Sequence, residues 1–219
     1  MLLTYLFENF YEETTFLKEA QISVADLSGL IQKRVMPKPS YIVKNTADVL
    51  SFVSSSCEVQ PYRFHLKNHV AWLETLHVLN LDSEARARAT FQVQYETAAK
   101  SFFISALGES ILAIMPRFPE GFDAVHFDAT WQYFLDGVYG VCTRNGMPGD
   151  IFLKQACVRF IDHFTEAFPD ADISPEHQKT VLAAVDILDK VESDFAPHEV
   201  SETSRQRCII NMREKLARM

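Results

Sequence analysis

The segment DFAPHEVSETSRQRCIINMREKLARM, residues 194–219, is the densest collection of polar and charged groups in the chain. Pro197 ends the helical pattern before it, because proline lacks a backbone N–H and disfavours helix in the preceding residue. Ser201 then suits the N-cap of a final helix, whose last turns carry the cations that a helix C-terminus favours. The segment therefore predicts a tight corner between two helices.

Four polar residues fall in this corner: His198, Glu199, Ser204 and Arg205. In the simpler interpretation they cap helix ends and bridge the corner, as polar side chains at helix termini commonly do. In the alternative interpretation they line a pocket that binds a ligand. The sequence leaves both roles open and favours the first.

Composition places the chain among soluble globular proteins. Hydrophobic residues make up 47% and charged residues 23% of 219 positions, which is enough for a substantial core. Seven glycines stand against seventeen phenylalanines, and few glycines disfavour a fold with many tight turns. We therefore expect an all-α, multi-helix orthogonal bundle with an N-terminal helix-turn-helix-like unit and a short wing or strand. The net charge of −8 argues against a nucleic-acid partner.

The cysteines and the N-terminal residues bear on location. Cys57, Cys142, Cys157 and Cys208 are widely spaced and form no CxxC pair, so we expect reduced, unlinked thiols and no zinc finger. The first residues are apolar but lack the basic stretch of a signal peptide. No apolar run approaches the length of a membrane-spanning helix. We expect a cytoplasmic protein that does not contact a membrane.

Residues 1–47 are the predicted helix-turn-helix-like unit. Ser23 can cap its later helix, with Asp26 three residues on in a weak form of the capping box. The two prolines of MPKPSY, residues 36–41, then force an extended segment. This order resembles the opening of winged-helix proteins of the MerR type. Because the later helix lacks an early cluster of base-reading side chains, we expect a structural or protein-binding unit, with DNA binding as an alternative.

Residues 48–61 show no clear periodicity and include three consecutive serines, so they predict a loop between this unit and a helical main domain, residues 62–219. The main domain opens with a predicted helix from Phe64 to Leu79. His65 and His69 stand four apart on it, at a spacing that two metal ligands can use. No HExxH arrangement accompanies them. We therefore predict no metal and no cofactor.

A central helix is predicted over FDATWQYFLDGVYGVC, residues 127–142, because the segment is apolar nearly all round. Asp136 would then be a buried carboxylate that requires a partner. Arg205 is the predicted partner, with Lys154 as the second choice. Further helices are expected from Asp82 or Ser83 to Met115, with a kink at Gly108, and over residues 148–168, with Pro148 in the first turn. Another is expected from Pro175 to about Ser193, with Ser174 as its N-cap.

Two segments resemble a known family. WQYFLDGVYGVCTRNGMPGDIFLKQ and the later ILDKVESDFAPHEVSETSRQR are similar to a family of uncharacterised bacterial proteins that are labelled natural product biosynthesis proteins. The resemblance singles out Pro39, Ser40, Tyr41, Asp136, Gly137, Tyr139, Gly140, Cys142, Lys154, Phe195–Glu199, Ser204 and Arg205. The family's arginine-rich PHERARSSR run reads PHEVSETSR here. The resemblance implies no reaction, substrate or cofactor.

Three functions follow as hypotheses. The first is a non-enzymatic accessory or binding protein in which polar residues form a buried ionic network. The second is a small-molecule-binding or catalytic helical domain, and the third is a DNA-binding regulator. The partner is a small anionic ligand or another protein. The candidate pocket or network comprises Asp136, Tyr139, Lys154, His198, Glu199, Ser204 and Arg205.

Overall fold

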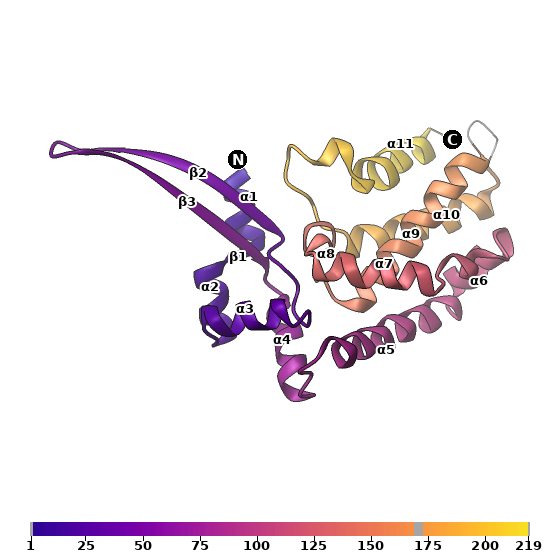
Figure 1. Ribbon diagram of the computed structural model, residues 1–219. Helices are drawn as coiled ribbons and strands as arrows, with labels where there is room; N and C mark the ends of the chain where they lie inside the picture. Colours follow the sequence, from indigo (N-terminus) through magenta and orange to yellow (C-terminus); the bar gives the residue numbers. More distant parts are fainter. Residues whose placement is uncertain (1, 169–172, 219) are drawn as a thin grey trace.

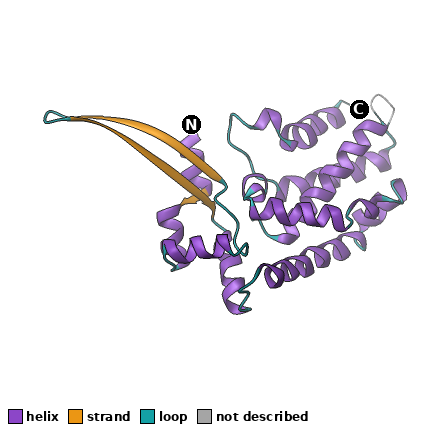
Figure 2. Ribbon diagram, viewed as in Figure 1, coloured by secondary structure: helices purple, strands orange, loops and turns teal. Residues whose placement is uncertain are grey.

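A computed structural model describes residues 2–168 and 173–218. The chain is mostly helical and carries one three-stranded antiparallel sheet, so the all-α expectation is right only in outline (Figures 1 and 2). Helices pack together in one body, and a long β-hairpin projects from its N-terminal side. Among the described residues, no single helix has the length and apolar character needed to cross a membrane. Helices α5 (Glu84–Phe103) and α6 (Ala106–Ile114) pass this test only when they are taken together, and they are bent by 77° relative to each other.

The N-terminal part contains the sheet and three short helices. Its elements are α1 (Leu2–Asn9), β1 (Phe10–Glu12), α2 (Glu13–Ala20), α3 (Val24–Gln32), β2 (Tyr41–Leu50) and β3 (Ser55–Leu66). The strands run antiparallel in the order β1-β3-β2. Ser23 caps α3 in a capping box with Asp26, each side chain accepting a hydrogen bond from the other residue's backbone N–H. This local signal was therefore read correctly from the sequence.

The expected loop over residues 48–61 is wrong. Strands β2 and β3 pair through this region, from Tyr41 opposite Phe64 out to Leu50 opposite Ser55. The turn is confined to Ser51–Ser54, where the Ser51 N–H donates to the Ser54 carbonyl and Ser51 Oγ accepts from the Ser54 N–H. The serine run belongs to the turn and the start of β3. We call residues 44–61 the arm.

The helical body follows. Its elements are α4 (His69–Val78), α5 (Glu84–Phe103), α6 (Ala106–Ile114), η1 (Phe118–Gly121), α7 (Ala124–Leu135), α8 (Val138–Cys142), α9 (Pro148–Ala167), α10 (Pro175–Val191), η2 (Val200–Glu202), η3 (Arg205–Ile210) and α11 (Asn211–Ala217). Helix α9 packs between α5 and α10. Pro148 begins α9, and Ser174 with Pro175 begins α10, as expected from their start signals. The terminal helix expected from Ser201 is instead a 3-10 turn, a π-helix and a short α-helix.

The largest fully buried side chains of the core are aromatic rings. Trp72 meets Phe91 and Phe134 edge to face, and Trp131 stacks on Phe134. Edge-to-face pairs of this kind add stability beyond the area that they bury. The Trp72 indole N–H donates to the Val35 carbonyl at 2.8 Å, so the segment after α3 is tied to the same core.

The single helix expected over residues 127–142 is also wrong, because it is broken at Gly137. This glycine adopts a φ of +78°, and its Cα faces the carbonyl oxygens of Lys38 and Pro39 so closely that a Cβ would lie 2.7 Å from the first. Glycine is suited to this position because it has no Cβ, so it adopts a left-handed backbone conformation easily and lets another backbone segment come close. The break turns α8 away from α7 and lets the MPKPSY segment cross the junction.

Candidate functional site

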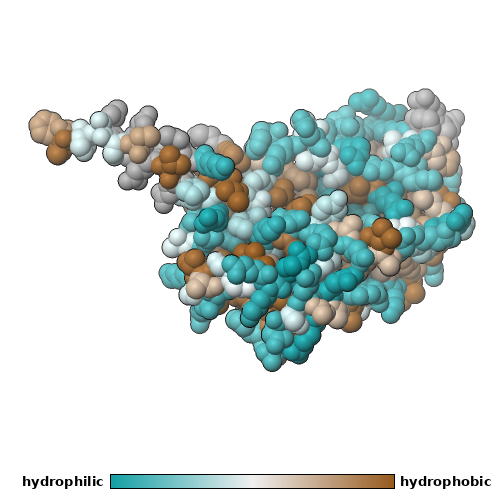
Figure 3. Space-filling model, in the orientation of Figure 1, coloured by the Kyte–Doolittle hydropathy of each residue, from teal (hydrophilic) through white to brown (hydrophobic). Residues whose placement is uncertain are grey.

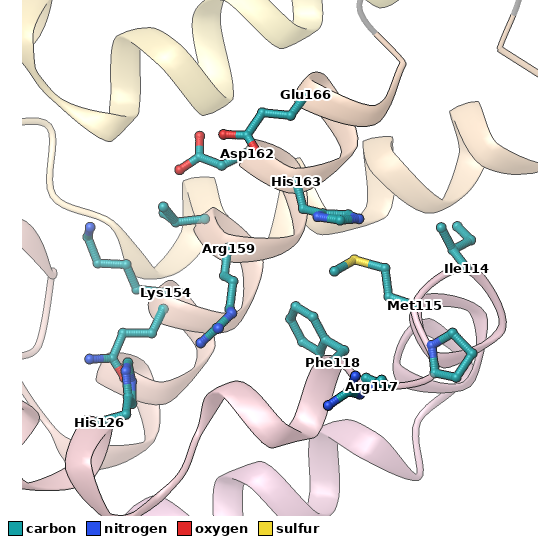
Figure 4. Close-up of a pocket in the computed structure, with 13 residues that line it drawn as sticks. Ile114, Met115, Arg117, Phe118, His126, Lys154, Arg159, Asp162, His163 and Glu166 are labelled. Carbon is teal, nitrogen blue, oxygen red and sulfur yellow. The ribbon is translucent and has the colours of Figure 1, made fainter.

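A pocket with a volume of about 800 Å³ lies beside α9. It opens between α9 and the turn from the end of α6 to η1, with α7 closing one end (Figure 4). A volume of this size is typical of sites for small organic molecules. The residues that line it are Ile114, Met115, Pro116, Arg117, Phe118, His126, Lys154, Gln155, Val158, Arg159, Asp162, His163 and Glu166.

Helix α9 supplies one wall because its two faces differ. Cys157, Phe160, Ile161 and Phe164 are buried in the core. Positions three and four apart on the other side, from Lys154 to Glu166, present the polar groups. Across the gap, Pro116 follows α6 and prevents it from continuing, so the chain turns back along the pocket. The pocket is therefore the space between α9 and the segment after α6, where the chain reverses direction.

The far wall of the pocket is apolar. Ile114, Met115 and Phe118 extend into the space in Figure 4, and Val158 faces it from α9. Phe118 is held by edge-to-face contacts with Phe122 and Phe160. A fixed aromatic ring beside flexible aliphatic side chains suits hydrocarbon groups of varied shape.

One end of the pocket is ordered by the amide of Gln155. Its Oε1 accepts from the Tyr95 hydroxyl at 2.6 Å, and its Nε2 donates to Thr130 Oγ1 and to the Tyr139 hydroxyl at 2.9 and 2.6 Å. His126 Nε2 lies 3.1 Å from the same Oε1, an atom that can only accept, so this ring nitrogen carries the hydrogen. Burial raises the pKa of Tyr95 and of Tyr139, so both phenols stay neutral.

Lys154 connects the pocket to the C-terminal corner. Its Nζ lies 3.1 Å from Glu192 Oε1 and 3.1 Å from the hydroxyl of Ser204, which itself donates to the same Glu192 oxygen. The Glu192 side chain is fully buried and that of Lys154 is 12% exposed. Glu192 Oε2 has no hydrogen-bond partner within the described part of the chain. The sequence identified Lys154 and Ser204 but missed Glu192, which looked like an ordinary helix-terminal acid.

The corner itself is an ionic network. Arg205 pairs with Asp189 at 2.9 Å and with Asp194 at 3.1 Å, while Arg144 and Arg213 pair with the same two carboxylates. Burial raises the pKa of Asp189, but the hydrogen bond from Arg213 and the nearby charge of Arg205 outweigh it and lower the value overall. Arg205 therefore holds the corner together and does not line the large pocket.

The predicted ion pair between Asp136 and Arg205 is wrong, as is the alternative pair with Lys154. The Asp136 carboxylate is 53% exposed and binds the ammonium of Lys38 at 2.7 Å. Because α7 ends at Leu135, Asp136 lies at the cap of the helix and points away from the core. The expectation failed because it assumed a helix that continues through Gly137.

The remaining predicted residues lie in different parts of the structure and do not form one site. Tyr139 joins the Gln155 network, and His198 is exposed. Glu199 accepts a hydrogen bond from the Tyr41 hydroxyl at 2.7 Å and another from the Ala196 N–H, so it ties the corner to β2. Sequence reasoning missed His126, Gln155 and Arg159. These residues lie on the polar side of α9 and at the start of α7. In the sequence, such positions look like the solvent-exposed side of any amphipathic helix.

The two histidines examined as metal ligands do not share a helical face. His65 lies in β3 and stacks on Phe16, whereas His69 opens α4. Burial, and then the charge of His65, lower the pKa of His69 to about 3, and neither of its ring nitrogens has a partner within the described residues. Over residues 2–168 and 173–218, no group of three or more His, Cys, Asp or Glu side chains is placed to hold a metal ion.

Comparison with known proteins adds one match. The model of a family of unknown function (DUF6058) matches residues 87–217, a range that contains every residue lining the pocket. Neither the curated proteins nor the solved structures include a match to this chain.

Proposed function

The chain belongs to the DUF6058 family, and we propose that it is a non-enzymatic binding protein for a small amphipathic molecule with a negatively charged end. The observation that carries this proposal is the pocket of about 800 Å³ beside α9, with an apolar wall at one side and cationic groups at the other. Pockets that combine a large apolar surface with a few placed polar groups are typical ligand sites.

The charge of the pocket supports an anionic group. Arg117, Lys154 and Arg159 line it together with the acids Asp162 and Glu166. Arg117 is paired with Glu120 and Lys154 with Glu192, so the support for an anionic group comes mainly from Arg159. Asp162 is already bound by Arg207, whose Nε and Nη2 donate to its two oxygens at 2.7 and 2.8 Å, so its charge is compensated from outside the pocket.

Arg159 is the side chain best placed to bind that group. Its guanidinium lies over the Phe122 ring and donates to the Gly121 carbonyl, which together fix its position. A guanidinium has five N–H donors in a rigid fork, so others remain for a carboxylate or phosphate. In Figure 4 the Arg159 side chain extends into the space between α9 and η1.

Binding is better supported than catalysis because the reactive groups have partners elsewhere. The Ser204 hydroxyl donates to a carboxylate, and Lys154 forms an ion pair with that same carboxylate. His126 Nε2 faces the Gln155 amide. An activated nucleophile needs a base aimed at its proton, and the described residues around the pocket do not present that arrangement. A catalytic helical domain remains the alternative.

The finer assignment rests on the resemblance described for the WQYFLDGVYGVC and PHEVSETSR segments. It supports an accessory role linked to natural product biosynthesis, and the widely spaced cysteines support a cytoplasmic location.

A second candidate is a DNA-binding regulator. The order α1, β1, α2, α3, β2, β3 and the turn between α2 and α3 favour it, because a short helix pair followed by a hairpin resembles DNA-binding modules. Residues 1–68 contain as many acidic as basic residues, however, and Arg34 is turned toward the body, where it pairs with Glu84. The charge therefore opposes it. A gel shift with random duplex DNA at physiological salt decides: a tight, salt-sensitive complex would favour DNA binding.

The binding proposal is tested by calorimetry with three ligands that share one chain length: decanoate, decanol and decyltrimethylammonium. We expect decanoate to bind at least about tenfold more tightly than the cation, a difference of ~1.4 kcal/mol. Arg159→Gln should weaken decanoate binding and leave decanol binding unchanged. The matched control is Arg86→Gln, an exposed residue outside the pocket. Equal affinity for all three ligands, or equal losses in both variants, would reject an anion-selective site.

A further inference from the structure

The arm extends from the body as a two-stranded ribbon (Figure 1). Strand β1 covers β3 only from Phe64 to Leu66, and no other described strand pairs with the arm. An isolated two-stranded hairpin is marginally stable in water, because it buries little apolar surface. A ribbon of this length is therefore a segment that gains stability when another surface covers it.

The arm carries hydrophobic side chains in full contact with solvent. Phe52 and Val53 at the turn are 104% and 88% exposed, and Val59 on β3 is 71% exposed. The free end of the arm is hydrophobic in the space-filling view of Figure 3. Ile42, near the base of β2, is a further exposed apolar residue at 59%. The apolar residues thus lie at both ends of β2, at the turn and at the base.

The two long edges of the ribbon differ. Strand β2 is the outer strand of the sheet, and its edge meets no other described strand along Tyr41–Leu50. Strand β3 contains Pro61, and proline within a strand is accommodated with its missing N–H on the unpaired side. Pro61 therefore blocks strand addition on the outer edge of β3, whereas the edge of β2 stays competent to pair.

Charge selects the kind of partner. The charged residues of the arm, residues 44–61, are Lys44 at its base and the acids Asp48 and Glu58, so its formal charge is negative. A ribbon with one cation at its base and two acidic residues lacks the cluster of cations that binds nucleic-acid phosphates or anionic lipid headgroups. A protein strand needs only backbone donors and acceptors together with apolar contacts.

We propose that the arm joins two copies of this chain, with β2 of one copy pairing antiparallel with β2 of the other about a two-fold axis. Antiparallel pairing of an edge with itself is self-complementary, as a two-fold interface requires. It places the turn of each arm, with Phe52 and Val53, beside the base of the other β2, near Ile42. The exposed apolar residues at the two ends of β2 then cover each other across the axis.

Sedimentation equilibrium across the micromolar range tests the assembly. The complete chain should be a dimer. A variant in which residues 44–61 are replaced by Asn-Gly, so that the facing residues Val43 and Tyr62 are joined by a two-residue hairpin turn, should be monomeric. Circular dichroism and thermal melting of the variant check that the body still folds. A complete chain that is monomeric, or an armless chain that still dimerises, would overturn the proposal.

A second measurement uses the complete, unshortened arm. Of the four cysteines, all within the described ranges, Cys57 alone is exposed, and it lies on β3 opposite Asp48. Spin labels on Cys57 should report an inter-chain distance of roughly 20–40 Å, since strands lie about 4.8 Å apart and rise about 3.4 Å per residue. The double variant Phe52→Ser/Val53→Ser should weaken this coupling. The absence of dipolar coupling, or a gel shift of duplex DNA that is lost in the armless variant, would refute pairing between copies.

Discussion

The Nζ atom of Lys154 lies 3.1 Å from Oε1 of Glu192, and this pair joins the wall of the pocket to the C-terminal corner. The carboxylate is fully buried, and the ammonium is nearly so. Two such charges are tolerated away from water only when they meet each other with good geometry. Ser204 completes the arrangement by donating to the same oxygen. The pocket and the corner are therefore not independent.

Replacing Lys154 by methionine should cost about 3–5 kcal/mol of unfolding free energy, because it leaves a buried carboxylate without its cation. The double variant Lys154→Met/Glu192→Leu should lose much less than the sum of the two single variants, since no unpaired charge remains. Urea melts of the three proteins measure this. Small losses that simply add would show that the two side chains do not interact.

Asp136→Ala should lower the unfolding free energy by no more than about 1 kcal/mol, because its pair with Lys38 is more than half exposed and screened by solvent. Lys38→Ala should have a similarly small effect. Urea melts check both changes. A loss several times larger for Asp136→Ala would instead restore the idea of a buried carboxylate at this position.

Unfolding free energy should depend on pH through His69. Its pKa is lowered from 6.5 to about 3 by burial and by the charge of His65, so between these values the unfolded chain binds a proton that the folded chain does not. Stability is therefore fully present above about pH 6.5 and falls as the pH drops toward 3, by up to about 1.4 kcal/mol per unit from this group.

His69→Phe should flatten that fall, whereas His77→Gln, a change at an exposed histidine of the same helix, should leave it unaltered. Urea melts at a series of pH values between these limits give the slopes. Identical slopes for the wild-type chain and His69→Phe would mean that His69 is not the group responsible.

The thiols should react in two classes. Burial raises the pKa of Cys142, and that of Cys157 and Cys208 to about 12, so these thiols resist thiolate formation in the folded protein. Titration with a chromogenic disulfide, without reductant, should detect Cys57 rapidly and all four thiols only in denaturant. Fewer than four after denaturation would reveal a disulfide.

Local signals were readable from the sequence. The capping box of Ser23 and Asp26, and the proline starts of α9 and α10, depend on residues within one helical turn, so a single sequence contains all the information. The overall helical character followed in the same way from composition and periodicity.

Non-local features were not readable. The arm was expected to be a loop because its pairing depends on which residues face one another across the turn, such as Val43 and Tyr62. Asp136 was expected to be buried because the break at Gly137 depends on contact with the distant carbonyls of Lys38 and Pro39. The pocket was missed because its polar wall, including Gln155 and Arg159, looks like the solvated side of any amphipathic helix.

The account's central claim is that the pocket beside α9 binds an amphipathic anion. The most direct test is calorimetric titration of decanoate into the wild-type chain and into Val158→Trp, which fills the pocket from α9. The matched control is Val93→Trp, an exposed position on α5 outside the pocket. We predict that wild type and Val93→Trp bind alike and that Val158→Trp loses at least about tenfold in affinity, ~1.4 kcal/mol. Failure of the wild-type chain to bind, or unchanged binding by Val158→Trp, would contradict the claim.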